Sequence, residues 1–184
     1  GKSVAEYDPV ADPEDQRHSD GFSHLDRFVS FIRATKAPPR DERLAATADA
    51  RAGEHVFEQI GCGVCHVASI RTAPAGTKIN GGQFQVPEAL GDKLIHPYSD
   101  FLLHAVGTGD GIPVQSGGQS TADKIRTAPL WGLRTRPELM HDGASTAPEH
   151  AILRHGGEAQ LPVDEFCKLS PRQKKELLTF LSSL

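Results

Sequence analysis

Two cysteines and a histidine stand in the order Cys62-Gly63-Val64-Cys65-His66. This Cys-x-x-Cys-His spacing lets two thiols add across the two vinyl groups of haem while the next residue ligates the iron. Once both thioethers have formed, the porphyrin is held against the turn, so the adjacent imidazole can reach the iron on one face only. The motif therefore predicts one covalently attached haem c, with Cys62 and Cys65 as attachment sites and His66 as the proximal ligand.

Two other chemistries use a Cys-x-x-Cys pair. A zinc site needs two further Cys or His ligands at ligand spacing, and the third cysteine, Cys167, has no cysteine near it in the sequence. A redox-active dithiol is typical of a βαβ context, whereas the residues around this motif predict a helix and a loop. The residues favour haem attachment. Because thioethers to haem are generally formed outside the cytoplasm, we expect an exported, in bacteria periplasmic, protein.

The residues themselves leave the second axial ligand of the iron open. The candidates are the single methionine and several histidines: Met140, His96, His104, His141, His150 and His155. A histidine taken alone is more often a surface residue than a ligand. The sequence by itself favours Met140 and His155 only slightly.

Several segments resemble the bacterial di-haem cytochrome c peroxidase superfamily, and most closely its di-haem oxidoreductase, or thiol-oxidoreductase-like, branch. They are residues 95–100 (Ile-His-Pro-Tyr-Ser-Asp), 126–133 (Arg-Thr-Ala-Pro-Leu-Trp-Gly-Leu), 140–143 (Met-His-Asp-Gly) and 151–158 (Ala-Ile-Leu-Arg-His-Gly-Gly-Glu). The resemblance extends over residues 21–184. It implies a haem-binding C-terminal domain of the c type.

The resemblance also implies a second iron ligand. In the peroxidases of that superfamily, the sixth ligand of the electron-entry haem stands fourteen residues after the His of the His-Asp-Gly motif. Counted from His141, this position is His155, where the peroxidases have methionine. The implied ligation is His66/His155, with Met140 as the alternative. An imidazole stabilises ferric iron more than a thioether does, so this pair predicts a lower reduction potential.

Three further residues are candidates for haem contact. Arg126 and Trp131 carry the donors that partly buried propionates need, although core packing explains Trp131 equally well. His141 is expected near the haem edge, where Asp142 helps to shape a turn. The glycine-rich residues 107–111 lack the carboxylates that a calcium loop requires.

Charge and hydropathy exclude two classes of partner. The net charge is −4, from 20 Lys and Arg against 24 Asp and Glu, so no basic field attracts nucleic acid or an anionic membrane surface. No apolar run approaches the ~20 residues that span a bilayer. We expect a redox protein or a second haem domain as the partner. The start at Gly1, without an initiator methionine, indicates a mature or cut product.

The composition predicts short helices joined by long loops, because hydrophobic residues make up 38% of the chain while it has 18 Gly and 13 Pro. We expect a mainly α fold: a cytochrome c-like helical haem domain over residues 50–184, preceded by an N-terminal arm and helical extension over 1–49. We expect helices to start at Ser23, near residue 50, and at Ser99, Thr146 and Ser170. The helix from Ser99 is expected to run to residue 106, and the helix at Thr146 to open with a capping box to Glu149. Residues 67–98 are expected to form an irregular loop.

The helix before the motif also matches c-type cytochromes. Gly53 and Phe57 stand one turn apart there, and Phe180 lies in the last helix. In such domains these two helices cross, and the small glycine lets them approach closely. Cys167 is expected as a small buried side chain, with an exposed thiol as the alternative.

The sequence therefore predicts a mono-haem domain for electron transfer with six-coordinate iron. The alternative is a peroxidase-like oxidoreductase, which needs a vacant or vacatable iron position. The superfamily it resembles carries two haems, whereas this chain has one Cys-x-x-Cys-His motif, so the second haem domain would be absent from this chain. Under that alternative, Gly156 and Gly157 could let His155 swing away from the iron.

Overall fold

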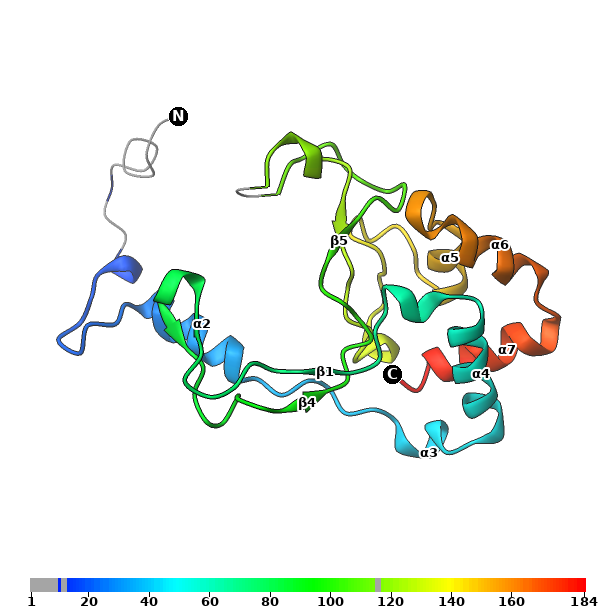
Figure 1. Cartoon of the computed structure of the whole chain (residues 1–184), viewed down its shortest axis with the longest axis horizontal. Coiled ribbons are helices and arrows are strands. Elements are labelled where there is room, and N and C mark those ends of the chain that lie inside the picture. The colour runs from blue at the N-terminus through cyan, green and yellow to red at the C-terminus, as the bar shows by residue number, and fades with distance from the viewer. Residues whose placement is uncertain (1–9, 11–12, 115–116) are drawn as a thin grey trace. The chain divides into compact units, whose positions relative to one another are not determined.

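The computed structural model describes residue 10 and residues 13–114 and 117–184. The chain divides into two compact units, Gly1–Ala37 and Pro38–Leu184, whose elements are drawn in Figure 1. The arm expected over residues 1–21 lies largely outside the described residues. Its described part contains one turn of 3-10 helix, η1 (Pro13–Asp15).

The first unit contains helix α2 (His24–Ala34). Ser23 accepts a hydrogen bond from the Asp26 amide, and the Asp26 carboxylate accepts one from the Ser23 amide at 3.0 Å. This capping box confirms the helix start that the sequence predicts, because it satisfies two amides that the first turn leaves unpaired. None of the helix residues is buried within this unit.

The second unit contains five α-helices among its described residues. They are α3 (Glu42–Ala45), α4 (Ala48–Gln59), α5 (Pro148–Leu153), α6 (Gln160–Lys168) and α7 (Pro171–Leu181). The sequence predicts α4, α5 and α7, whereas α3 and α6 are additional. A second capping box, between Ser170 and Gln173, starts α7 as predicted. Within the described residues, no helix is both long enough and apolar enough to cross a membrane.

Six short strands form three antiparallel pairs within the region expected to be loop or helix. The pairs are β1 (Ile70–Arg71) with β4 (Leu94–Ile95), β2 (Lys78–Ile79) with β3 (Phe84–Gln85), and β5 (Leu103–His104) with β6 (Ile125–Arg126). Each strand is two residues long, so the pairs fasten loops to one another and do not build a layer.

The predicted mainly α, cytochrome c-like fold class is wrong. About 41% of the chain is helical and 8% is strand, and the described elements are six α-helices with three small sheets. The segment between α4 and α5 is long and rich in glycine, proline and residues with positive φ, so it forms turns and short pairs in place of helices.

The helix predicted from Ser99 to residue 106 is also wrong. Phe101 has φ +59°, which is left-handed and incompatible with a right-handed helix. The Ser99 and Asp100 side chains accept hydrogen bonds from the amides two residues on, at 2.9 Å each, which closes turns at these positions. The chain then enters β5.

Helix α5 forms where predicted but starts differently. Its N-cap is Ala147, which has no side-chain capping bond, so the predicted capping box around Thr146 is wrong. Pro148 occupies the first turn, where its missing N–H costs nothing and its fixed φ suits a helix. Helix α5 ends at Leu153, two residues before His155.

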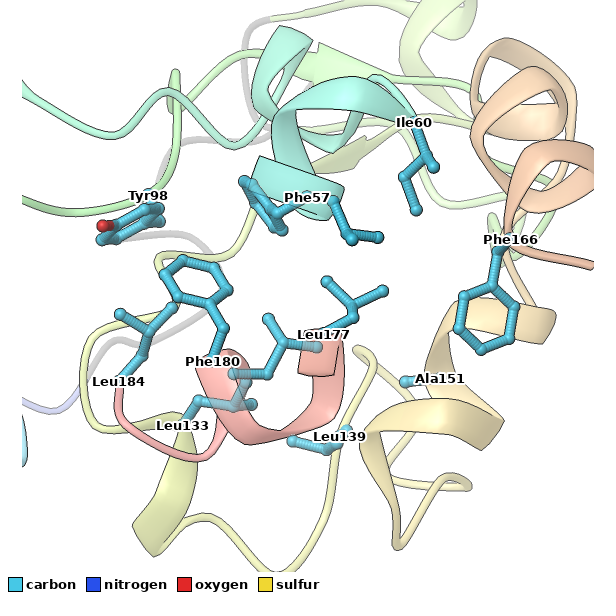
Figure 2. Close-up of a cluster of buried hydrophobic side chains, with 12 residues drawn as sticks. Phe57, Ile60, Tyr98, Leu133, Leu139, Ala151, Phe166, Leu177, Phe180 and Leu184 are labelled. Carbon is cyan, nitrogen blue, oxygen red and sulfur yellow. The ribbon is translucent and has the colours of Figure 1, made fainter. Parts of the chain in front are cut away.

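The core lies where α4 crosses α7, as Figure 2 shows. A Cβ atom built on Gly53 would lie 1.9 Å from the Glu176 carbonyl oxygen and 2.8 Å from the Phe180 Cβ, so only glycine permits this crossing. The rings of Phe57 and Phe180 pack with centroids 5.2 Å apart. The close approach of the two helices predicted from these residues is confirmed.

Candidate functional site

The Cys-x-x-Cys-His segment forms a tight turn directly after α4. Gly61 ends the helix with φ +90°, and Cys62–Val64 then forms one turn of 3-10 helix, η2. The His66 amide donates to the Cys62 carbonyl at 2.9 Å, which closes the turn behind both cysteines. The helix end and the left-handed glycine together fix the direction in which the motif leaves the core.

Both thiols of the turn are free, and both are held in the neutral form. Burial raises the pKa of Cys62 to about 12, with a further contribution from the nearby Glu58. Burial also raises the pKa of Cys65, and the negative charges of Asp100 and Glu158 add to the effect. Redox-active dithiols have lowered thiol pKa values, so this environment argues against a thioredoxin-like function.

His66 offers one ring nitrogen to a ligand. Its Nδ1 lies 2.9 Å from the Tyr98 carbonyl oxygen, and because a carbonyl only accepts, Nδ1 must carry the proton. The lone pair is then on Nε2, which has no hydrogen-bond partner among the described residues. Burial lowers the pKa of His66, and the nearby His155 lowers it further, which favours the neutral, ligating form of the ring.

Tyr98 holds this acceptor in place. Its hydroxyl donates to the Glu54 carboxylate of α4 at 3.1 Å, and its ring packs on Phe57 and Phe180 with centroids 6.0 and 5.6 Å away. Figure 2 shows these three rings grouped together, with Phe57 on the ribbon of α4 and Phe180 on the ribbon of α7. Burial and the Glu54 charge raise the pKa of Tyr98 to about 12. The core thus fixes the orientation of the His66 ring through the Tyr98 backbone.

His155 has the same arrangement as His66. Its Nδ1 lies 2.8 Å from the Ala151 carbonyl oxygen in α5, so Nδ1 carries the proton and Nε2 keeps its lone pair. No described residue makes a hydrogen bond to that Nε2. His155 also lies close enough to His66 to affect its pKa. The structure therefore brings together two half-buried imidazoles, each with one uncommitted nitrogen.

The other candidates for the second ligand are less well placed: Met140 packs against the core, and His96, His141 and His150 are exposed. Met140 has φ +66° and packs against the hydrophobic core. His141 is exposed, and its Nε2 donates to the Thr108 carbonyl at 2.8 Å. His96 is exposed and bonds to Ser69 through Nδ1 at 2.8 Å. Their exposure, and the proximity of His155 to His66, favour His155 as the second ligand.

One further group of ligand-type side chains lies beside the turn. The candidate ligand atoms of Cys65, Asp100 and His104 lie within 4.8 Å of one another, the one such group among the described residues. Both ring nitrogens of His104, however, lie within 2.9 Å of carboxylate oxygens and must donate to them. His104 therefore has no lone pair for a metal, and the group does not fit a metal site.

The predicted propionate partners lie on the segment that packs against residues 97–102. Arg126 is exposed in β6, opposite Leu103, and its side chain has no hydrogen bond or ion pair within the described chain. Trp131 is half-buried, with its ring 6.2 Å from that of Phe101. Their role in haem contact stays a prediction.

Thr108 carries a buried hydroxyl beside the segment of His155. Thr108 Oγ1 is the one fully buried side-chain polar atom without a hydrogen-bond partner in the described part of the chain. It belongs to the residue whose carbonyl accepts from His141, and Gly107 before it lies against Gly156. A buried hydroxyl without a partner costs about 1–3 kcal/mol, and because protein atoms already cover it, it is not a contact point for a bound group.

Some of these functional features are not apparent in the sequence. The Tyr98 carbonyl is a backbone group 32 residues from His66, and no residue type signals it. The Tyr98 side chain does lie in the segment that resembles the superfamily, which was the available signal. Cys167 is exposed, so the expected burial of this thiol is wrong.

Two neutral thiols on a turn and two imidazoles with free Nε2 atoms could hold a haem. The sequence matches, over residues 10–184, the family described as "Di-haem oxidoreductase, putative peroxidase". The chain belongs to this di-haem oxidoreductase family, which confirms the predicted relationship and implies haem binding. No curated protein and no solved structure matches the sequence.

Proposed function

We propose that this chain carries one haem c, attached through Cys62 and Cys65 and ligated by His66 and His155, and that it transfers single electrons. The observation that supports this most is that both histidines donate Nδ1–H to a backbone carbonyl, at 2.9 and 2.8 Å, and keep Nε2 free. When bound, the iron would supply a one-electron couple between its ferric and ferrous forms.

The protein residues have separate tasks in this proposal. Cys62 and Cys65 lie on one tight turn directly after α4, so attachment there would fix the porphyrin relative to the core. Tyr98 orients His66, and the Ala151 carbonyl of α5 orients His155. Such outer hydrogen bonds fix the tautomer and direction of a ligating imidazole and raise its basicity.

The structure favours a carrier over the peroxidase-like alternative. That alternative needs His155 to leave the iron, and Gly156 and Gly157 would be the hinge. The Gly156 amide donates to the Val106 carbonyl at 2.8 Å, and the Glu158 amide donates to the Ala105 carbonyl at 2.9 Å. These bonds hold the segment after His155, so we propose that the iron stays six-coordinate, which leaves no site for peroxide.

We further propose the setting in which this chain acts. The family name indicates two haems, and this chain has one motif, so the electron partner is a second haem domain or a separate redox protein. Because thioether attachment is generally completed outside the cytoplasm, we place the protein in the periplasm or a comparable exported compartment. A redox titration of the chain with and without candidate partners measures this coupling.

The covalent link is tested by cysteine replacement. After expression with a haem-attachment system, we expect the Cys62→Ala/Cys65→Ala double variant to lose its pigment on extraction with acidified organic solvent. The unmodified chain retains the pigment, since thioethers survive that treatment. Mass spectrometry of the denatured chain measures the same difference.

Cys167→Ala is the matched control for this experiment, because it removes a thiol that is exposed and remote from the motif in sequence. We expect the control to retain its pigment and its visible spectrum unchanged. Covalent haem on the double variant, or none on the unmodified chain, would show that the attachment proposal is wrong.

A further inference from the structure

His104 forms a bridge between two segments of the site. Its Nε2 lies 2.9 Å from the Asp100 carboxylate, and its Nδ1 lies 2.8 Å from the Glu158 carboxylate. Both acceptors are carboxylate oxygens, so both nitrogens donate and the ring is an imidazolium. The two carboxylates raise the pKa of His104, with Glu158 contributing most. The ring is largely buried, with 18% of its side-chain surface exposed.

The two ends of this bridge are joined to the two segments that carry the proposed iron ligands. The Asp100 amide donates to the Cys65 carbonyl at 2.8 Å, which fastens Asp100 to the attachment turn beside His66. Glu158 stands three residues after His155, and its second carboxylate oxygen accepts from the Ala105 amide at 2.9 Å. The bridge therefore runs from the His66 side, through His104, to the His155 side.

The backbone at Glu158 shows why this connection matters. Gly157 has φ +54°, and a Cβ atom on it would lie 2.2 Å from the Ala105 carbonyl oxygen. The chain after His155 thus passes in contact with the residues that follow β5, and it contains two adjacent glycines, which restrain the backbone least of all residues. The hydrogen bonds around Glu158, and not the glycines, keep this segment in position.

We propose that His104 is a positioning residue for His155: its bridge from Asp100 to Glu158 holds the segment that carries the proposed second ligand. This inference rests on the proposed function. Without the bridge, His155 leaves the iron more often, and external ligands gain access. A purely structural histidine would alter stability but would not alter competition for the iron.

The test measures external ligands on the haem-loaded chain. We expect the His104→Phe and Glu158→Ala variants to bind carbon monoxide in the ferrous state and to bind cyanide in the ferric state at least about ten-fold more tightly than the unmodified chain. This ratio corresponds to a loss of about 1.4 kcal/mol in the free energy with which His155 competes for the iron. Phenylalanine keeps a planar ring at position 104 but offers no donor.

Two variants serve as controls. In Glu158→Gln, the amide can donate to Nδ1 of a neutral His104 while Nε2–H still donates to Asp100, so the bridge persists and ligand binding stays as in the unmodified chain. His96→Phe removes an exposed histidine with one hydrogen bond, to Ser69, and should also have no effect. If the His104→Phe variant does not accumulate as folded protein, the Glu158→Ala variant tests the proposal, because it leaves the His104 ring in place.

The possible failures are distinguishable. If the unmodified ferrous chain itself binds carbon monoxide fully, or holds no haem, the proposed function fails and this inference with it. If the unmodified chain is six-coordinate and excludes carbon monoxide, while His104→Phe and Glu158→Ala behave identically to it, the positioning role of His104 alone is wrong. Tighter cyanide binding in Glu158→Gln as well as Glu158→Ala would also contradict the bridge.

Discussion

The His155→Gly variant of the haem-loaded chain is expected to bind carbon monoxide stoichiometrically in the ferrous state, whereas the unmodified chain binds little or none. Among the residues that the structure describes, the substitution removes the one half-buried imidazole near His66 that keeps a free Nε2. Loss of a strongly donating ligand also destabilises ferric iron, so the reduction potential should rise by on the order of 100 mV. Visible spectra under carbon monoxide and a redox titration measure both effects.

Added imidazole provides the sharpest control for this prediction. It should enter the space left by His155, restore the six-coordinate spectrum and compete with carbon monoxide. His150→Ala, an exposed change in the same helix α5, should leave both measurements unchanged. If the His155→Gly protein keeps its spectrum, another residue is the second ligand. Loss of the far-red ferric band in a Met140→Leu variant would then identify the Met140 thioether as that ligand.

The Gly53→Ala variant is expected to lower the free energy of unfolding by at least about 2 kcal/mol. Helix propensity alone would stabilise α4 by about 1 kcal/mol, because alanine is the better helix former. The new Cβ, however, would lie 1.9 Å from the Glu176 carbonyl oxygen and 2.4 Å from its carbon. These are backbone atoms of α7, so the helices must separate. Overpacking of this kind destabilises the fold by more than the higher helix propensity of alanine stabilises it.

Urea unfolding followed by far-ultraviolet circular dichroism measures this change. Arg51→Ala, on the exposed side of α4, is the matched control and should shift stability by less than about 0.5 kcal/mol. The crossing also positions Phe57, whose ring centroid lies 6.3 Å from that of His66. Displacement of Phe57 would disturb His66, so Gly53→Ala should reduce haem retention as well. A variant as stable as the unmodified chain would contradict the close approach of α4 and α7.

The parts of the fold set by local chemistry could be predicted from the sequence. Ser23 with Asp26, and Ser170 with Gln173, satisfy the first amides of their helices with side chains three residues apart. The two residues of each capping box are three positions apart, so neighbouring sequence contains the signal. The crossing at Gly53 involves distant residues, and it is the resemblance of Gly53, Phe57 and Phe180 to c-type cytochrome domains that implies it.

The parts set by distant contacts could not be predicted. The Ser99–Asp100 pair has the pattern of a helix start, yet the left-handed Phe101 and pairing with β6 make the following segment a strand. The spacing of Asp100 and His104 suggests one helical face, whereas their contact arises from a turn followed by a strand. Propensity is a weak prior, and tertiary contacts override it in such segments.

The candidate site divides in the same way. The cysteines and His66 follow from their spacing, and His155 from the resemblance. The role of Tyr98 depends on its main-chain oxygen, and the bridging of His104 depends on Glu158, 54 residues away. Backbone acceptors have no side-chain signature, so only the folded chain shows which ring nitrogen of each histidine remains available.

The acceptors at Tyr98 and Ala151 are neutral peptide groups, and peptide groups do not titrate in the physiological range. A carboxylate in either place could accept the Nδ1 proton of its imidazole and give that ring imidazolate character. With peptide acceptors, each ring keeps its proton whether the metal gains or loses charge. Oxidation and reduction of the proposed centre would then need no proton exchange at its ligands, which suits rapid reaction with small rearrangement of the surroundings.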